Sequence, residues 1–324
     1  MAFLTSTKGY YSVYSVFGKV RFARHYFTAV GQEGVCPLDA DLSLPARCYS
    51  NLLQEWGTYG TTDASYHESQ AARARILGVG VGRAALETMA DDAAVDVEAF
   101  YAQPLSPEAR ATAGPLLVVQ ADGKGVPMVQ PPARARPVRL GKGQKRTKKK
   151  EAVVTSLYTI APYVRTPQEV VAALLQDRNR PPDTAPRPTP LGKERRATLD
   201  GKEVALTRLA ARARQREGRH IQERVALTDG AEALQKQMET HFPEHTLVLD
   251  IIHATDYLWN AANALLGETH PDRLAWIRTH LEHLLAGDTS AVITTLERAA
   301  QDPARTATQR KALLGTAGGS VGFC

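Results

Sequence analysis

The first thirty residues alternate between apolar and polar side chains. From Gly9 to Val30, aromatic or β-branched residues are interleaved with polar ones, which is the period of a half-buried β-strand. Phe17-Gly18-Lys19 interrupts this alternation and supplies a turn. The pattern predicts an N-terminal β-hairpin.

The pattern becomes helical between about Ala64 and Gln103. One helix is predicted over SYHESQAARARIL, ending at Gly78, and a second over RAALETMADDAAVDVEAFYAQ, with VGVG as the turn between them. This is the outline of a DNA-binding helix-turn-helix. An ordinary αα-hairpin has the same outline and is more common, so both interpretations remain open at this point.

Strand-like and helical segments alternate in the rest of the chain. PLLVVQAD predicts a strand that ends at Asp122, and Lys150 to Ala161 predicts a neighbouring strand. Thr166, Pro167 and Glu169 mark the start of a helix, as the N-cap, the first helical residue and the acid of a capping box. The prolines and arginines from Asp177 to Arg196 predict an extended loop.

Four further elements follow this loop, and then a helical region. They are a strand at Arg224–Leu227, a helix at Ala231–His241, a strand at Thr246–Ile252 and a helix at about Thr255–Leu266. From Pro271 to Leu314 every segment has a helical period, whereas the tail GTAGGSVGFC has none. The predicted regions are 1–103, a hairpin and helical DNA-binding region; 104–115, a linker; 116–266, an α/β core with a loop or insertion at about 177–220; 267–315, a helical insertion; and 316–324, an irregular tail.

The distribution of charge says more than the total. The chain has 40 lysines and arginines against 34 acids, a net charge of +6, which is compatible with a nucleic-acid partner but does not require one. Between Pro131 and Lys150 there is a basic tract without any acid, which consists of Arg134, Arg136, Arg139, Lys142, Lys145, Arg146, Lys148, Lys149 and Lys150. A second basic tract runs from Arg187 to Arg224. Solvated loops and helix faces would explain either tract alone, but two tracts beside the same strands fit contact with a phosphate backbone better.

Two other classes of protein are disfavoured by the sequence. Three cysteines, Cys36, Cys48 and Cys324, are too few and too irregularly spaced for a disulfide framework or a zinc ribbon. No apolar run reaches the roughly 18 residues that a membrane span needs, and no signal peptide follows Met1. We therefore expect a cytoplasmic, nucleoid-associated protein with no membrane partner.

Two aspartates occupy equivalent places in the pattern. Asp122 follows VVQA and precedes a glycine, and Asp229 follows VALT and precedes a glycine. In an α/β sheet the carboxyl ends of the strands converge on a site, and glycine lets the chain turn away sharply. Carboxylates brought together there repel unless a divalent cation lies between them, and Mg²⁺ or Mn²⁺ prefers such oxygen ligands. A simple turn is the alternative for each Asp-Gly pair.

The segment LDIIHATDYLW contains a third acid. Asp250 and His253 are three residues apart on a predicted strand and its exit, where their side chains would point to opposite faces. A metal pair is conceivable, but we favour a supporting role in which Asp250 makes hydrogen bonds and His253 lies at the strand-to-helix junction.

Several segments in order resemble the DDE transposases of bacterial insertion sequences, most closely the ISKra-type group. These segments are DGKGV at Asp122, KKEAVVTSLYTIAPYVRTPQEVV, VALTDGAEALQ at Asp229, and FPEHTLVLDIIHATDYLWNAANAL. The resemblance covers about Leu116 to Gly315 and, more weakly, the N-terminal region. Each motif alone is weak, and the specificity comes from their order.

The resemblance implies a ribonuclease-H-like mixed sheet with a helical insertion. It places the first catalytic acid on the first strand, at Asp122, and the second after the fourth strand, at Asp229, with both as ligands of two Mg²⁺ or Mn²⁺ ions. Asp250 and His253 are similar to a signature on the fifth strand, and Asp250 as the second acid is a lesser option. The implied partners are the terminal repeats of the element and target DNA, bound by a homodimer or larger assembly.

One part of the family pattern is missing. The third acid of the family is a glutamate on the last helix, within a Gly-x-Gly-x-x-Glu type segment, whereas here no acid follows Asp302. The expectation is therefore a truncated or frameshifted copy with little or no activity. A non-catalytic DNA-binding protein derived from a transposase and an unrelated metal-dependent nuclease of the same fold are the alternatives.

Overall fold

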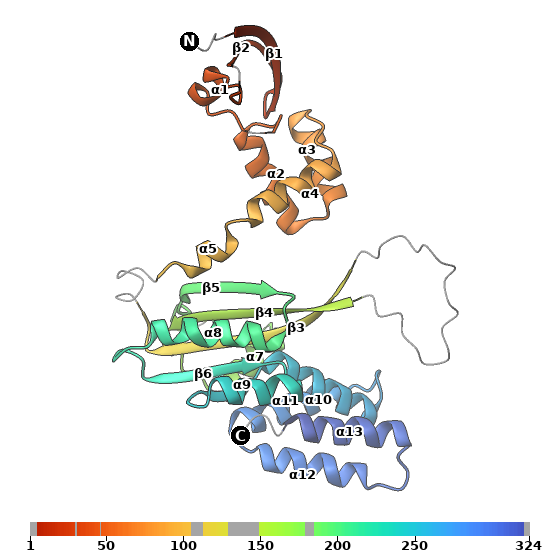
Figure 1. Cartoon of the computed structure of the whole chain (residues 1–324). Helices are drawn as coiled ribbons and strands as arrows, with labels where there is room; N and C mark the ends of the chain where they lie inside the picture. Colours follow the sequence, from red (N-terminus) through yellow and green to blue (C-terminus); the bar gives the residue numbers. More distant parts are fainter. Residues whose placement is uncertain are drawn as a thin grey trace, which may run out of the picture. The chain divides into compact units, whose positions relative to one another are not determined.

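The structure is a computed structural model, and it describes residues 5–29, 31–45, 47–104, 113–128, 149–178 and 185–320. The chain divides into two compact units, Met1–Gln103 and Pro104–Cys324. Figure 1 follows the chain through both units, and each is described here by itself.

The N-terminal unit begins with the predicted hairpin. Strands β1 (Thr5–Ser15) and β2 (Gly18–Thr28) pair antiparallel, with Ser15 opposite Gly18 across a two-residue turn. The hairpin prediction is confirmed, and the ladder starts at Thr5, four residues earlier than the alternation indicated.

Helices make up the rest of this unit. They are α1 (Pro37–Asp41), α2 (Asn51–Asp63), α3 (Tyr66–Leu77), α4 (Arg83–Ala94) and α5 (Val97–Ala102). The predicted helix that ends at Gly78 is α3, and Gly78 adopts the left-handed conformation of a C-cap, with φ of 66°. The second predicted helix is wrong in one respect, because the chain breaks it into α4 and α5.

Sequence reasoning missed α2, because two glycines weaken its helical pattern. The structure shows what these glycines permit. A Cβ atom on Gly57 would lie 2.8 Å from the sulfur of Met89, and one on Gly60 would collide with the guanidinium of Arg73. Both glycines therefore allow α2 to pack closely against its neighbours.

The core of the N-terminal unit lies among its helices and the tip of the hairpin. Its buried members are Leu53, Val79, Val81, Leu86 and Met89, with Tyr14, Val16 and Tyr49 packed against them. Hydrogen bonds from Tyr14 N to Cys48 O (2.7 Å) and from Ser50 N to Tyr14 O (2.8 Å) fix β1 to the segment that leads into α2.

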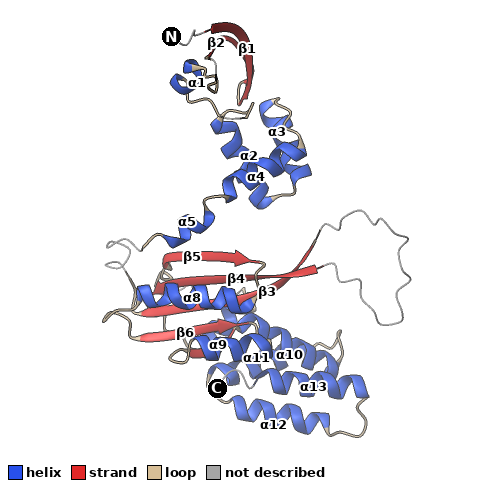
Figure 2. Ribbon diagram, viewed as in Figure 1, coloured by secondary structure: helices blue, strands red, loops and turns tan. Residues whose placement is uncertain are grey.

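A five-stranded mixed sheet organises the described part of the second unit (Figure 2). Its strands are β3 (Leu116–Pro127), β4 (Lys149–Ile160), β5 (Leu191–Thr198), β6 (Glu223–Thr228) and β7 (Thr246–Leu249). Their spatial order is β5-β4-β3-β6-β7. The pairs β3–β4 and β4–β5 are antiparallel, whereas β3–β6 and β6–β7 are parallel.

Helices cover the sheet and form a bundle beside it. They are α7 (Pro167–Leu174), α8 (Lys202–Arg216), α9 (Glu232–His241), α10 (Ile251–Leu266), α11 (Arg273–Leu285), α12 (Thr289–Ala300) and α13 (Ala307–Ser320). The capping box of Thr166 and Glu169 starts α7 as predicted. One core packs the sheet against α8 and α9, through residues such as Leu117, Leu206 and Met238. A second core joins α7 to α10, α11, α12 and α13.

The predicted extended loop from Asp177 to Arg196 is wrong at its end, because β5 begins at Leu191, and the helix α8 that follows was not predicted. Strand β5 reads as polar because it is an edge strand with many exposed side chains. In α8 the many charges hide an apolar stripe at i, i+3, i+4 and i+7, formed by Leu206, Leu209, Ala210 and Ala213, which are all buried.

Three further boundaries differ from the sequence predictions. Strand β3 does not end at Asp122 but continues to Pro127. Strand β7 ends at Leu249, three residues before the predicted end at Ile252. Residues 316–320 of the predicted irregular tail belong to α13, and residues 321–324 lie outside the described residues. Among the described helices, none is long and apolar enough to cross a membrane.

Candidate functional site

Three aspartates follow the last paired residues of the parallel strands. The last pair between β3 and β6 is Gln120 with Leu227, and Asp122 and Asp229 each come two residues later, beyond the paired part of this ladder. The last pair between β6 and β7 is Thr228 with Leu249, so the next residues are Asp229 and Asp250. We call Asp122, Asp229 and Asp250 the carboxylate row. It lies where the parallel ladder ends, the place at which side chains of an α/β sheet converge.

Asp122 lies within a strand and not at a turn. It is paired with Val154 of β4, and the β3–β4 ladder continues for five more residues, to Pro127. Gly123 has no positive φ, so the Asp-Gly pair here is extended backbone. The predicted sharp turn after Asp122 is therefore wrong, although the exposed side chain of Asp122 does follow the end of the parallel ladder.

Asp229 has the predicted turn after it. Gly230 has φ of 83°, a conformation that glycine adopts without strain. A Cβ atom at this position would also lie 2.8 Å from Cδ1 of Leu249. The Oδ1 atom of Asp229 accepts a hydrogen bond of 3.0 Å from the backbone N–H of Ala231, which holds the carboxylate at the end of β6.

Asp250 is the N-cap of α10, because β7 has already ended. Its Oδ1 accepts a hydrogen bond of 2.7 Å from Ile252 N–H, and its own N–H donates to Thr228 O at 2.9 Å. His253 lies in the first turn of α10 and is exposed. The prediction that Asp250 and His253 point to opposite faces of a strand is therefore wrong, because residues three apart on a helix share a side. Asp250 accepts the hydrogen bond that caps α10, and its supporting role in a site stays a prediction.

Tyr158 indicates which side of the sheet Asp250 faces. Tyr158 pairs with Val118 of β3. Val118 and Asp122 are four residues apart on this strand, so their side chains and that of Tyr158 lie on the same face of the sheet. Burial raises the pKa of the Tyr158 hydroxyl, and the negative charge of Asp250 raises it further. The carboxylate of Asp250 is thus close enough to act on a side chain from the face that carries Asp122. Sequence reasoning missed Tyr158, since a tyrosine inside an apolar strand is typical of a core residue.

The donor chemistry of the row fits a hard divalent cation, but the ligand set is incomplete. Carboxylate oxygens are the ligands that Mg²⁺ accepts, and Asp229 and Asp250 each use Oδ1 for a backbone N–H. Over the residues that the structure describes, no group of three or more His, Cys, Asp or Glu side chains is close enough to hold a metal ion. The row as it stands could offer a cation at most two of its three carboxylates.

Cations lie next to the row on the extension of β3 and β4. Strands β3 and β4 remain paired with each other after their pairing with β6 and β5 has ended. This two-stranded arm carries Lys124, Lys149 and Lys150, which are all exposed. Seven residues of the predicted basic tract lie outside the described residues, namely Arg134, Arg136, Arg139, Lys142, Lys145, Arg146 and Lys148. The described part of the tract thus places Lys150 and Lys149 on the arm opposite Val126 and Pro127, four and five residues along β3 from Asp122.

Much of the second basic tract is neutralised within the fold. Glu194 of β5 binds Arg212 and Arg216 of α8 at 2.7 and 2.6 Å. Arg224 pairs with Glu217 at 2.7 Å, and Lys193 lies 5.2 Å from the centre of the Tyr158 ring. These arginines hold β5 and α8 together, which is a structural role that the sequence interpretation did not anticipate.

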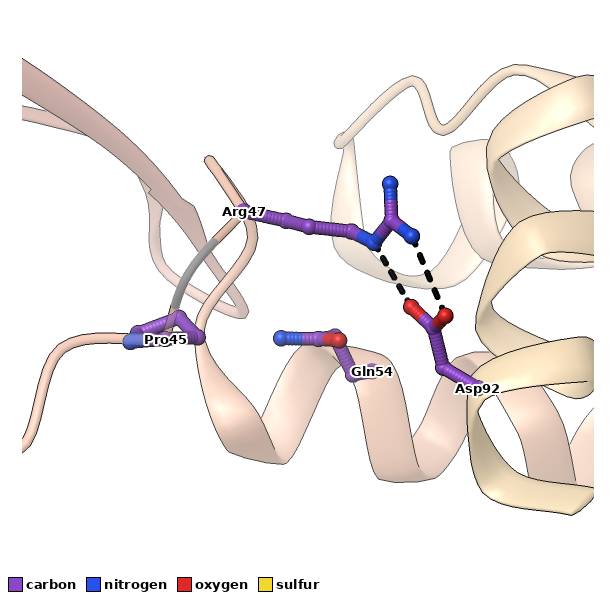
Figure 3. Close-up of a pocket in the computed structure, with 4 residues that line it drawn as sticks. All are labelled: Pro45, Arg47, Gln54 and Asp92. Carbon is purple, nitrogen blue, oxygen red and sulfur yellow. Dashed lines mark hydrogen bonds and ion pairs between the residues drawn. The ribbon is translucent and has the colours of Figure 1, made fainter. Parts of the chain in front are cut away.

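A shallow pocket in the N-terminal unit lies between the segment before α2 and helix α4 (Figure 3). It is lined by Pro45, Arg47, Gln54 and Asp92. Arg47 donates two hydrogen bonds to Asp92, at 2.6 and 3.0 Å, and the guanidinium lowers the pKa of that carboxyl. Gln54 donates to Tyr49 O at 2.8 Å, so the polar side chains of the pocket are all used within the unit, and Arg47 with Asp92 ties α4 to the segment after α1.

No protein-family model matches the chain, and no curated protein matches it either.

Proposed function

We propose that the chain is a metal-dependent polynucleotidyl transferase of the DDE transposase class, with a ribonuclease-H-like core. The strand order supports this proposal. If the strands are numbered along the chain, with β3 as the first and β7 as the fifth, their order in the sheet is 3-2-1-4-5. The neighbouring pairs among strands 1, 2 and 3 are antiparallel, and strands 4 and 5 run parallel to strand 1. A ribonuclease-H-like core has the same order.

The observation that carries the proposal is the alignment of Asp122 with Asp229. One acid comes from the first strand of the sheet and the other follows the fourth, and each lies two residues beyond the last pair that joins these strands. Neighbouring strands are about 4.8 Å apart, so two carboxylates at one level can share a cation. The sequence resemblance assigns the same two positions to catalytic acids.

The residues of the chain would divide the work as follows. A bound Mg²⁺ or Mn²⁺ would stabilise the negative charge on the reacting phosphate and activate the attacking hydroxyl. Asp122 and Asp229 would hold the ion, and the Gly230 turn would keep the second carboxylate at the strand end. Lys124, Lys149 and Lys150 on the arm would hold the DNA backbone through its phosphates.

A second candidate is a non-catalytic DNA-binding protein derived from such an enzyme. The hydrogen bonds of Asp229 and Asp250 favour it, because a carboxylate that accepts a backbone N–H at a turn or a helix N-terminus already has a structural role. The two functions differ in one measurable respect, which is whether Asp122 is needed for DNA cleavage.

The test is the nicking of supercoiled plasmid DNA by the full chain in Mn²⁺ or Mg²⁺. We expect slow nicking that requires the cation, because the described ligand set is incomplete. Asp122→Asn and Asp229→Asn should each abolish it. Glu297→Gln, which changes an exposed acid on α12, is the matched control and should nick at the rate of the unmodified chain.

Two results would separate the candidates. Cation-dependent nicking that survives both aspartate substitutions would remove the carboxylate row from the reaction. Binding of DNA without any nicking in either cation would favour the non-catalytic protein.

A further inference from the structure

One face of the N-terminal hairpin carries exposed cations. Residues opposite each other in an antiparallel pair point to the same side, and alternate residues along a strand share that side. Lys8 pairs with His25, Tyr10 with Ala23, Ser12 with Arg21, and Tyr14 with Lys19. We call Lys8, Tyr10, Lys19, Arg21 and His25 the ribbon face, and all five side chains are exposed.

The other face of the hairpin is held by the unit. Arg24 forms an ion pair with Asp39 of α1, and Tyr11 packs edge-on against Phe22 while its hydroxyl donates to Arg47 O at 3.3 Å. Val13 on the same side is buried. These contacts fix the orientation of the hairpin. On the side of the ribbon face Tyr14 packs against Tyr49 and the core, whereas the five residues of the ribbon face are exposed.

The charge of the ribbon face is not compensated. From Thr5 to Thr28 the sequence has no acid. Within the described chain Lys8, Lys19 and Arg21 form no ion pair. Arg21 instead lies 4.4 Å from the centre of the Tyr10 ring, and Lys19 lies 5.4 Å from that of Tyr14. The tyrosines therefore hold these cations in place without neutralising them.

The helices of the same unit have the opposite charge. From Tyr66 to Ala102 there are six acids, Glu68, Glu87, Asp91, Asp92, Asp96 and Glu98, and three arginines, Arg73, Arg75 and Arg83. Arg73 is buried and donates hydrogen bonds to backbone carbonyls of Ser69 and Gly57, at 2.7 Å each. A helix-turn-helix that enters a DNA groove needs a basic surface, so α3 and α4 are poor candidates for that role.

We propose that the ribbon face is the element of the N-terminal unit that binds double-stranded DNA. The inference rests on the proposed function for the identity of the partner, DNA, and adds which surface binds it. A two-stranded ribbon fits the B-DNA major groove, about 12 Å wide. Each strand has 11 residues, about 35 Å of extended chain, which is about one turn of B-DNA.

Two features favour duplex DNA over other nucleic acids. Binding of single strands relies on open aromatic rings that stack on bases, whereas the rings of Tyr10 and Tyr14 are occupied by Arg21 and Lys19. The major groove of double-stranded RNA is deep and narrow, so protein elements do not read it. The ribbon face thus matches the phosphates and groove of a DNA duplex.

The test compares two double substitutions of equal charge in the full chain. Lys19→Gln/Arg21→Gln alters the ribbon face, and Arg75→Gln/Arg83→Gln alters exposed arginines on α3 and α4. Affinity for a fluorescent DNA duplex is measured by anisotropy over a range of salt concentrations. The first variant should bind about tenfold or more weakly, and its slope of log affinity against log salt should fall by about 2. The second should bind within about twofold of the unmodified chain.

An RNA duplex of the same sequence completes the test, and we expect it to bind more weakly than the DNA. Binding is measured in EDTA, without a divalent cation, so that failure of the carboxylate row in the nicking assay and failure of the ribbon face in this assay are separate results. Equal or greater loss in the Arg75→Gln/Arg83→Gln variant would overturn the inference, as would unchanged binding in the Lys19→Gln/Arg21→Gln variant. Equally tight binding of the RNA duplex would overturn the major-groove assignment.

Discussion

The five-stranded sheet and the two-stranded hairpin use the same alternation of side chains for different purposes. In the sheet, helices α8 and α9 cover one face, and the residues with chemistry lie where the parallel ladder ends. In the hairpin, one face is held by α1 and by Arg47, and the other face is open and cationic. A covered sheet can fix carboxylates where its neighbouring strands end, whereas an open ribbon presents charge to a large partner. Matched substitutions in the two regions test this difference.

The largest expected difference in stability between the two regions comes from substitutions of apolar side chains. Leu206 is fully buried between α8 and the sheet, whereas Val20 of the hairpin is 50% exposed. We expect Leu206→Ala to lower the free energy of unfolding by about 2–5 kcal/mol, because it leaves a cavity. Val20→Ala should change it by less than about 1 kcal/mol. Urea unfolding followed by tryptophan fluorescence measures both, and equal losses would contradict the contrast.

The next difference concerns arginines. Arg216 is 8% exposed and binds Glu194, which is 23% exposed and also binds Arg212. Arg216→Met should cost about 1–3 kcal/mol, less than a fully buried pair, because Arg212 remains as a partner. Arg21→Met on the ribbon face should leave stability unchanged within about 0.5 kcal/mol. A smaller loss for Arg216→Met than for Arg21→Met would show that the Glu194 cluster does not hold β5 to α8.

The same cluster gives a dependence on pH. Burial acts to raise the pKa of Glu194, but hydrogen bonds from Arg212 and Arg216 outweigh it, so the pKa is lowered. A carboxyl with a lowered folded pKa adds stability above its unfolded pKa of about 4.3. This contribution is lost as pH falls through the folded pKa. Stability curves of the unmodified chain and of Glu194→Gln should therefore converge in acid, and parallel curves would contradict this.

Substitutions of glycines should give a smaller difference in stability between the two regions. Gly230 has φ of 83° and Leu249 next to it, whereas Gly9 of β1 has open space around its Cα. Gly230→Ala should lower stability by about 1–3 kcal/mol. Gly9→Ala should be neutral or slightly stabilising, since alanine restricts the unfolded chain. Thermal unfolding of both variants measures the difference, and a stable Gly230→Ala variant would show that the turn after Asp229 is not constrained.

Histidines give the smallest expected effect. Burial lowers the pKa of His245, which lies next to Phe242, whereas His25 is exposed on the ribbon face. A histidine with a lowered folded pKa stabilises the fold above its unfolded pKa of about 6.5. Stability is then lost as pH falls from there through the folded pKa. His245→Gln should flatten the stability curve in this range, and His25→Gln, at an exposed position, should change stability at neutral pH by less than about 0.5 kcal/mol. A curve for His245→Gln as steep as that of the unmodified chain would contradict the assignment.

The sequence predicted most elements because their patterns are local. The hairpin, the C-cap at Gly78 and the capping box at Thr166 depend on residues close together in the chain, and all three are present. Strand β5 and helix α8 were missed because their polar surfaces depend on tertiary contacts, such as the cluster around Glu194. Helix α2 was missed because its glycines, Gly57 and Gly60, are unfavourable in a helix. Their role is to leave room for Met89 and Arg73, and this contact is visible only in the folded structure.

The candidate site was only partly predictable for a related reason. Asp122 and Asp229 could be named from their place after apolar strands, but their alignment depends on the register of β3 against β6, which no local pattern fixes. Asp250 was assigned to a strand, since LVLDII is apolar enough to be one, whereas its side chain starts helix α10. The ribbon face was overlooked because the helix-turn-helix outline is the more familiar DNA-binding element.

Binding of Mn²⁺ to the full chain, measured by electron paramagnetic resonance, tests the central claim most directly. The carboxylate row should bind one Mn²⁺ weakly, since Asp122 and Asp229 follow the ends of the same parallel ladder but no complete ligand group is found among the described residues. Asp122→Asn should abolish this binding and Glu297→Gln should preserve it. Binding that is equal in the unmodified chain and in Asp122→Asn, or absent from both, would contradict the assignment of a metal site to the carboxylate row.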